Sequence, residues 1–118
     1  MALVSSAYSA SVNFIIDALK LRPYFNLILS GGDIRKRKPD PECYLTALKK
    51  LELSKEGVIV IEDTEAGLKA AFNAGIKSFG IRHEYNQVHD FSSAFGEYGS
   101  FENEIGQIRK DITILFTY

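Results

Sequence analysis

The amino-acid sequence predicts an α/β domain built on a parallel sheet with right-handed crossovers. Short apolar runs alternate along the chain with segments of helical periodicity, which is the pattern of strand–helix–strand units. The run Val58–Ile61 is β-branched throughout and lacks polar alternation, as in a strand buried on both faces of a parallel sheet. Polar residues stand where several of these runs end, and in an open α/β sheet ligands bind at that edge.

The first third of the chain predicts two strands and one helix. Leu3–Ser5 is a short apolar strand, and helical periodicity begins at Ser9. The expected buried face of this helix consists of Val12, Ile15, Ile16 and Leu19. Tyr24–Leu29 is the second strand, and the Gly31–Gly32 pair after it marks a loop that turns sharply or approaches another segment closely.

The second helix has a clear start signal. Asp40 is a suitable N-cap, Pro41 fits the first helical position, and Glu42 complements the positive end of the helix dipole. Its apolar stripe comprises Tyr44, Ala47, Leu48 and Leu51. Cys43, the one cysteine, falls within this helix; it is a packed residue or, alternatively, a reactive thiol.

The remaining elements follow the same alternation. Thr64 is expected to cap a third helix, which ends at Asn73–Gly75 and buries Leu68, Ala71 and Phe72. Lys77–Ile81 predicts a further strand and Ile112–Phe116 a final one. Residues 83–104 show no convincing period, so we expect a loop there with at most one helical turn.

Size, charge and cysteine content favour one domain in a reducing, cytoplasmic setting. The chain has 118 residues, of which 46% are hydrophobic. A single cysteine excludes an internal disulfide. The formal net charge is −1, and no apolar stretch approaches the roughly 20 residues that span a bilayer. Met1–Val4 lacks the basic flank of a signal peptide. We expect neither nucleic acid nor membrane as a partner.

Adjacent Glu62 and Asp63 at a strand end are candidate metal ligands. Two neighbouring carboxylates repel one another, and a divalent cation relieves that repulsion. Mg²⁺ prefers oxygen ligands from one or two carboxylates together with water and phosphate. The alternative interpretation is that Glu62 faces solvent and Asp63 only caps the following helix.

Three further positions are weaker candidates. Lys38 is suited to neutralise a phosphate oxygen, although taken alone it fits a solvated loop better. Ser5 either donates a hydroxyl to a phosphate or simply ends its strand. His83 and His89 lack a neighbouring ligand at metal spacing, so we expect surface or packing roles for both.

Taken in chain order, these residues resemble three motifs of the haloacid dehalogenase-like superfamily, in its phosphatase and β-phosphoglucomutase-like branch. The resemblance lies within residues 2–81. Residues 2–6 resemble the second motif, which implies phosphate binding by Ser5 and Ser6. Residues 38–44 resemble the third, which implies that Lys38 pairs with nucleophile and phosphate. Residues 61–71 resemble the fourth, which implies that Glu62 and Asp63 hold Mg²⁺.

The resemblance implies a Rossmann-like three-layer fold and a phosphorylated small molecule as substrate, a sugar phosphate or similar. It also implies a catalytic role for Lys38 and Asp63. The family's first motif, an Asp-x-Asp pair that supplies the nucleophile, does not occur in this sequence, and neither does the cap. We therefore expect the chain to be the C-terminal part of a phosphohydrolase, able to bind phosphate and Mg²⁺ but inactive alone. Residues 82–118 would form an extension of the partial core domain 1–118.

The missing motif also has a structural implication. In the family the first strand is central, between the strands that carry the second and fourth motifs. Without it, either an N-terminal complementing segment joins the chain, or the two flanking strands close on each other, or the chain is unstable. Two other functions stay open: a non-catalytic interaction module on the same scaffold, and a receiver-like domain, although receivers present the acidic pair first.

Overall fold

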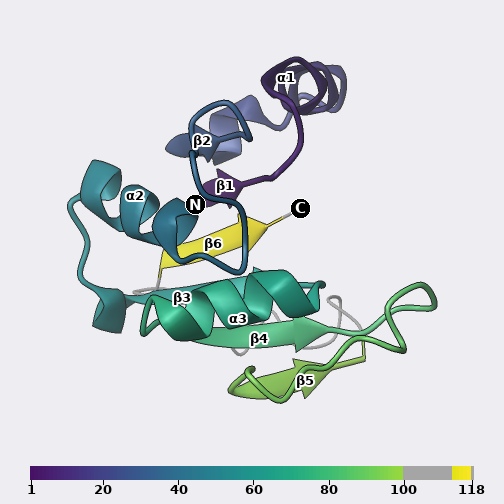
Figure 1. Ribbon diagram of the computed structural model, residues 1–118. Coiled ribbons are helices and arrows are strands. Elements are labelled where there is room, and N and C mark those ends of the chain that lie inside the picture. The colour runs from purple at the N-terminus through teal and green to yellow at the C-terminus, as the bar shows by residue number, and fades with distance from the viewer. Residues whose placement is uncertain (100–112, 118) are drawn as a thin grey trace.

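A six-stranded parallel sheet organises the molecule (Figure 1). The computed structural model describes residues 1–99 and 113–117. The strands are β1 (Ala2–Val4), β2 (Leu27–Leu29), β3 (Val58–Glu62), β4 (Lys77–Ile81), β5 (Gly96–Tyr98) and β6 (Thr113–Thr117). The helices are α1 (Ser9–Ala18), α2 (Glu42–Leu51) and α3 (Glu65–Asn73), with 3₁₀ turns at Arg22–Tyr24 and Lys55–Gly57. The α/β class and the parallel sheet are confirmed, and no described helix has the length and apolarity to cross a membrane.

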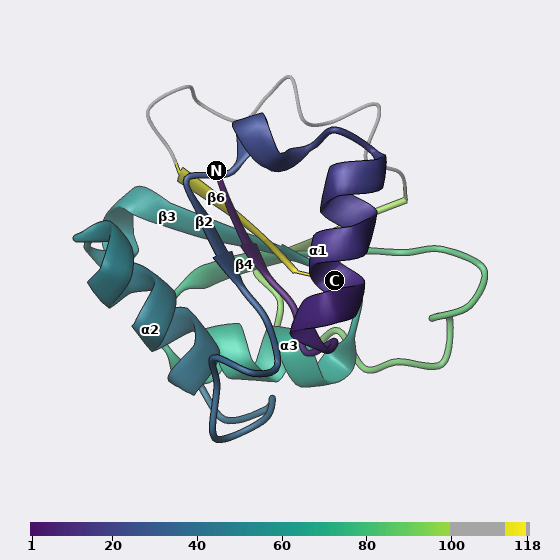
Figure 2. The ribbon, with the colours of Figure 1, turned by 90° about the horizontal axis from the view of Figure 1, so that it is seen from above.

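The strand order is β2-β1-β6-β3-β4-β5, so the last strand in sequence lies in the middle of the sheet (Figures 1 and 2). Leu115 of β6 is in register with Ala2 of β1 on one side and with Val60 of β3 on the other. The expected outcome in which β1 and β3 close on each other is wrong, because β6 lies between them. The position that the family resemblance assigns to the first strand is taken by β6.

Helices cover both faces of the sheet. Alternate residues of β1 point to opposite faces, because successive side chains of a strand do so. Ala2 and Val4 pack in the larger core with α2 and α3, and Leu3 packs with Val12 and Ile16 of α1. In Figure 1, α1 lies apart from α2 and α3. The architecture therefore has the three expected layers.

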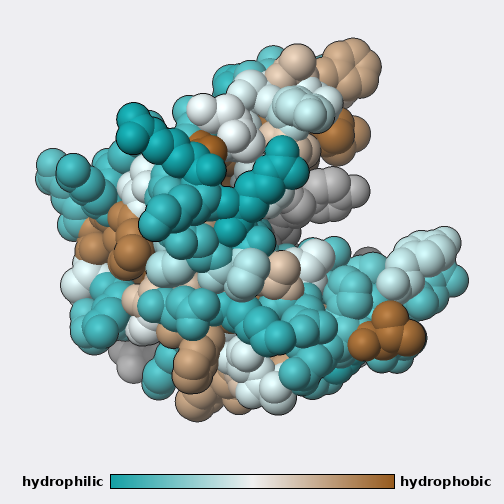
Figure 3. Space-filling view, in the orientation of Figure 1, coloured by the Kyte–Doolittle hydropathy of each residue, from teal (hydrophilic) through white to brown (hydrophobic). Residues whose placement is uncertain are grey.

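The predicted helices are confirmed, with corrections to one N-cap and to the burial of three apolar residues. Thr64 caps α3 by accepting a hydrogen bond from the backbone N–H of Gly67. The predicted cap of α2 is wrong by one residue: Pro41 is the N-cap, although the Asp40 carboxylate accepts from the N–H of Glu42. The predicted burial is wrong for Ile15, Leu19 and Phe72, which are exposed. Figure 3 shows apolar surface over α1, within an otherwise mostly hydrophilic face.

Two segments differ from the expected boundaries. The predicted strand Tyr24–Leu29 is shorter, because a 3₁₀ turn occupies its beginning and β2 starts at Leu27. The predicted loop over residues 83–104 contains the short strand β5, and no helix lies in its described part, which ends at residue 99. The final strand is confirmed as β6, with its bounds shifted by one residue along the chain. Ile112 lies outside the described residues.

Candidate functional site

Four strands end at the same edge of the sheet and place polar residues there. Since β1, β2, β3 and β4 all run parallel, their carboxyl ends meet at one edge. Ser5 follows β1 and Ser30 follows β2. Glu62 closes β3 and is followed by Asp63, and His83 comes shortly after β4. The candidate residues predicted from sequence therefore share this edge.

Ser5, Ser6 and Lys38 line one small cavity. Its remaining walls are Gly31, Ile34, Arg37 and Cys43, and its volume is about 10 Å³, room for roughly one water molecule. The Ser5 hydroxyl accepts a hydrogen bond from the N–H of Ala7 at 3.1 Å. Cys43 is buried, and burial raises the pKa of its thiol, so the packed interpretation of this cysteine is supported.

The glycine loop after β2 forms one wall of the cavity. The N–H of Gly31 donates to the carbonyl of Ala7 at 2.8 Å. A Cβ at Gly31 would lie 2.7 Å from the carbonyl oxygen of Ser6, which is too close for any other residue without a shift. The close approach predicted from the glycine pair therefore occurs, and it holds the loop against the serine segment.

A buried ion pair joins the loop before α2 to the end of β3. Lys38 Nζ lies 2.9 Å from Glu62 Oε2, and the two side chains are only 8% and 1% exposed. The Tyr44 hydroxyl donates to the same oxygen at 3.1 Å. Both alternatives from the sequence are thus corrected: Lys38 does not lie in a solvated loop, and Glu62 does not face solvent.

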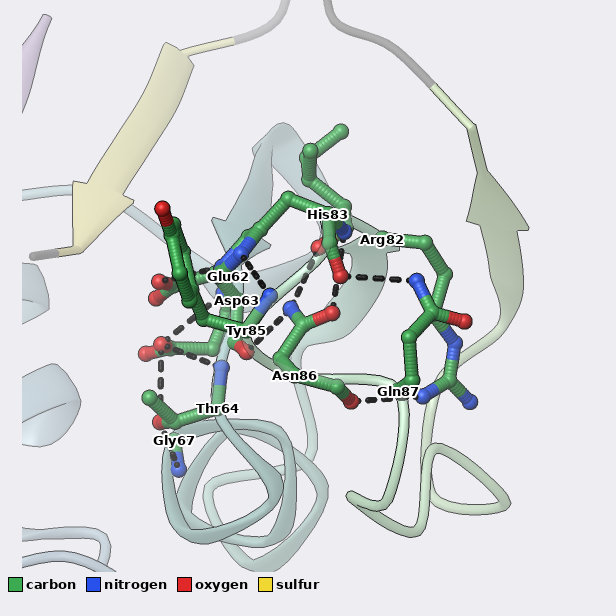
Figure 4. A network of polar contacts seen from close by, with 10 residues as sticks. Glu62, Asp63, Thr64, Gly67, Arg82, His83, Tyr85, Asn86 and Gln87 are labelled. Carbon is green, nitrogen blue, oxygen red and sulfur yellow. Dashed lines mark hydrogen bonds and ion pairs between the residues drawn. The ribbon is translucent and has the colours of Figure 1, made fainter.

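The second carboxylate oxygen of Glu62 is engaged by the start of α3. Oε1 accepts hydrogen bonds from the N–H groups of Asp63 and Thr64, both at 3.0 Å, and from the Thr64 hydroxyl at 2.9 Å. Gly67 lies directly against this carboxylate, because a Cβ there would overlap its atoms (Figure 4). Glu62 is consequently held on all sides by protein groups, whereas its neighbour Asp63 is not buried to the same extent.

Asp63 is half-buried and contacts a histidine. Its Oδ2 lies 3.3 Å from Nε2 of His83, and the two side chains are 37% and 39% exposed. Burial, followed by the nearby Glu62 carboxylate, raises the pKa of Asp63 above its ordinary value. An acid in this environment gains from a cation, so Asp63 is the better placed of the two predicted metal ligands.

The loop after β4 carries His83 to Asp63. Asn86, only 1% exposed, donates to the carbonyls of Asp63 and Ile81, both at 2.8 Å, and accepts from the N–H of His83 at 2.9 Å. Arg82 closes the loop further on by donating to the carbonyls of Asn86 and His89. Figure 4 shows this network between the loop and the end of β3.

The contact of His83 with Asp63 was missed from the sequence. The surface or packing role expected for His83 did not include this contact, in which its partly exposed ring reaches a candidate site residue. The signal was its position shortly after β4, at the same sheet edge as the other candidates. His89 has no such contact in the described residues, and its Nδ1 is buried without a hydrogen-bond partner there.

The described residues supply too few ligands to hold a Mg²⁺ ion by themselves, so water and phosphate oxygens would have to complete its shell. No three His, Cys, Asp or Glu side chains among residues 1–99 converge closely enough to hold a metal ion. Mg²⁺ commonly takes one or two carboxylates and completes its shell with water and phosphate oxygens. Asp63 offers one such carboxylate, and its neighbour Glu62 is paired with Lys38, which lines the cavity with Ser5 and Ser6.

Comparisons with known proteins give a consistent result. Residues 1–81 match the family described as haloacid dehalogenase-like hydrolase. A phosphorylated carbohydrates phosphatase of Thermotoga maritima is 41% identical over 69 residues, which are 58% of this chain and 32% of the relative. Protein CbbY of Rhodobacter capsulatus is 33% identical over 97 residues, which are 80% of this chain and 43% of the relative.

A solved structure agrees in fold. A crystal structure of mutant CbbY from Rhodobacter sphaeroides in complex with xylulose-(1,5)bisphosphate superposes with a TM-score of 0.80 at 27% identity, covering 86% of this chain and 47% of the other. The chain thus spans less than half the length of each of these three proteins.

Proposed function

This chain belongs to the haloacid dehalogenase-like hydrolase family, and from that premise we propose that it forms the phosphate- and Mg²⁺-binding part of a phosphohydrolase. The reaction class is Mg²⁺-dependent hydrolysis of a phosphate monoester, or phosphosugar mutation, through an aspartyl-phosphate. The substrate is a phosphorylated small molecule such as a sugar phosphate. The relatives support this class, because one is a phosphatase of phosphorylated carbohydrates and another was solved with xylulose-(1,5)bisphosphate.

The proposed roles follow from the geometry of the sheet edge. Ser5 and Ser6 bind phosphate oxygens through hydroxyls, and Lys38, which lines the same cavity, neutralises phosphate charge. Asp63 ligates Mg²⁺. We propose two roles for Glu62: it holds Lys38 in place, and it is the second candidate ligand of the metal. Because a phosphate is larger than one water molecule, its binding must widen the cavity.

One observation carries the proposal. Lys38 both lines the cavity with the two serines and pairs with Glu62 at 2.9 Å, next to Asp63. A hydroxyl pair, an ammonium and a carboxylate thereby share one small region, as a bound phosphate–Mg²⁺ pair requires.

We propose that the chain is inactive alone, because its sequence contains no Asp-x-Asp pair to supply the nucleophile. Turnover then requires an N-terminal complementing segment in a cytoplasmic protein. Since β6 occupies the place between β1 and β3, such a segment would have to displace β6 or dock elsewhere. The alternative function, a non-catalytic interaction module, is favoured by the same missing nucleophile. The family match gives no support to a receiver-like domain.

Isothermal titration with MgCl₂ and with inorganic phosphate tests the proposal. We expect the wild-type chain to bind both, Asp63→Ala to lose Mg²⁺ binding, and the exposed-site control Asp90→Ala to retain it. A wild-type chain without affinity for either ligand would favour the interaction module. Magnesium-dependent turnover of a generic phosphate ester by the pure chain would disprove the proposed inactivity.

A further inference from the structure

We infer that Arg37 is a further phosphate-binding residue, which supplies the positive charge that Lys38 shares with Glu62 and so offers only in part. This inference rests on the proposed phosphate site and names the cation that contributes most to its affinity. Three observations support it: the place of Arg37 on the cavity wall, the balanced charge of Lys38, and the different surroundings of the two basic residues that precede Arg37.

Arg37 both lines the cavity and is exposed to solvent. It shares the cavity wall with Ser5, Ser6 and Lys38, and of these four residues Arg37 and Ser6 are the exposed ones. The cavity itself has room for roughly one water molecule, which is less than a phosphate needs. The outer oxygens of a phosphate held by the serines would therefore lie on the solvent side of the cavity, where the guanidinium of Arg37 is available to them.

The charge of Lys38 is already balanced inside the protein. Its Nζ lies 2.9 Å from Oε2 of Glu62, and its side chain is only 8% exposed. The same ammonium lies 5.3 Å from the centre of the Tyr44 ring. A phosphate that approaches Lys38 must share it with a buried carboxylate, which repels the anion. Arg37 forms no ion pair with any residue that the structure describes, so its charge is the uncompensated one on the cavity wall.

The two basic residues before Arg37 have different surroundings. The backbone N–H groups of Arg35 and Lys36 donate to the Glu42 carboxylate, at 2.9 and 3.0 Å. On the other side, the N–H of Asp40 donates to the carbonyl of Arg37 at 3.0 Å, so the loop backbone is held both before and after this residue. Lys36 Nζ lies 3.7 Å from Asp40 Oδ2 and lines a separate groove beside α2. Of these three consecutive basic residues, only Arg37 lines the cavity.

The chemistry of the guanidinium group suits this place. Its planar fork donates two parallel N–H groups to two oxygens of one phosphate, and such charge-assisted pairs are both strong and directional. An ammonium at the same position acts as a point charge and does not match the two oxygens in this way. The ligand class is therefore an inorganic phosphate or a phosphate monoester whose outer oxygens stay free at the cavity.

Calorimetric titration of the full chain with inorganic phosphate tests the inference. In Arg37→Ala, the Kd for phosphate should rise about 10- to 100-fold, as for the loss of a hydrogen-bonded charge pair. Arg37→Lys keeps the charge but not the fork, and should recover part of the loss. The matched control is Arg35→Ala, which removes the same charge from the same loop and should raise the Kd less than about threefold. Equal effects of the two alanine changes would overturn the inference.

The outcomes separate this inference from the proposed function. A wild-type chain without affinity for phosphate would overturn both, whereas phosphate binding that is unchanged in Arg37→Ala would overturn the inference alone. A second test uses the wild-type chain, so it does not depend on the folding of any variant. Phenylglyoxal modifies arginine side chains, and mass spectrometry locates the modified residues. Phosphate should protect Arg37 and leave Arg35 reactive, and equal protection of the two, or of neither, would overturn the inference.

Discussion

Lys38 and Glu62 form an ion pair that is almost completely removed from solvent, with Nζ 2.9 Å from Oε2 and side-chain exposures of 8% and 1%. The pair connects the loop before α2 with the end of β3, two segments that are 24 residues apart in sequence. Removing charges from water is costly, and the pair persists because Tyr44 and Thr64 supply further hydrogen bonds to the same carboxylate.

Lys38→Met should therefore lower the free energy of unfolding by about 3–5 kcal/mol, because it leaves the Glu62 charge buried and unpaired by a cation. Adding Glu62→Gln should recover part of that loss. The matched control is Lys36→Met, whose ammonium lies 3.7 Å from Asp40 on the surface and should matter by less than about 1 kcal/mol. Urea unfolding at neutral pH measures all three, and equal effects of the two single changes would contradict the buried pair.

Gly67→Ala should displace the Glu62 carboxylate, against which Gly67 packs without room for a Cβ. We expect a loss of about 1–3 kcal/mol in unfolding free energy, as for other overpacked sites. Gly57→Ala is the control, since a Cβ at Gly57 meets nothing within 4 Å. Thermal unfolding of both variants measures the difference. If Gly67→Ala behaved as Gly57→Ala does, Glu62 would not lie where the structure has it.

Asp33 should stabilise the loop after β2 in a pH-dependent manner. The N–H and hydroxyl of Ser30 donate to its carboxylate, both at 2.8 Å, and these bonds lower the pKa of Asp33 below its ordinary value of 3.8. A lowered folded pKa gives stability that is present above the ordinary value and lost as the pH falls through the folded one. Because Asp33 is exposed, Asp33→Ala should cost only about 1 kcal/mol or less at neutral pH.

The difference between wild type and Asp33→Ala should shrink as the pH is lowered from about 4 to about 2. Urea unfolding across this range measures it. A constant difference down to the lowest pH would mean that the carboxylate charge contributes nothing to holding the loop.

The central place of β6 predicts a strong effect of proline there. Leu115→Pro removes a backbone N–H from a strand paired on both sides, so it should cost about 3 kcal/mol or more. Leu115→Val keeps that N–H and should cost much less. Amide hydrogen exchange of β1 and β3 provides the measurement, with faster exchange expected only in the proline variant. Unchanged protection in Leu115→Pro would show that β6 is not needed between them.

Local signals in the sequence were enough for the elements whose stability is local. The β-branched run of β3 and the capping threonine of α3 both predicted their structures, because burial and capping depend on a few neighbouring residues. The stripes of α1 and α3 were less accurate at Leu19 and Phe72. A helical period identifies a face, but how much of that face the sheet covers depends on packing elsewhere.

Pairing between distant strands could not be predicted in this way. A strand pattern at residues 112–116 gave no indication that β6 would lie between β1 and β3. The site shows the same limit: Lys38 and Asp63 were identified by their places in sequence, whereas the contact of His83 depends on a loop that the buried amide of Asn86 folds back.

The register Ala2↔Leu115 has a consequence for how the nascent chain folds. The β1–β2 unit and the β3–β4 unit are both synthesised before β6, and within the sheet their strands are joined through it. Until the ribosome has delivered residues 113–117, each unit exposes an unpaired strand edge, which is a template for association with other chains. Contacts of such long sequence separation also form slowly. Production of this protein should therefore benefit from slow expression at low temperature or from chaperones that cover strand edges.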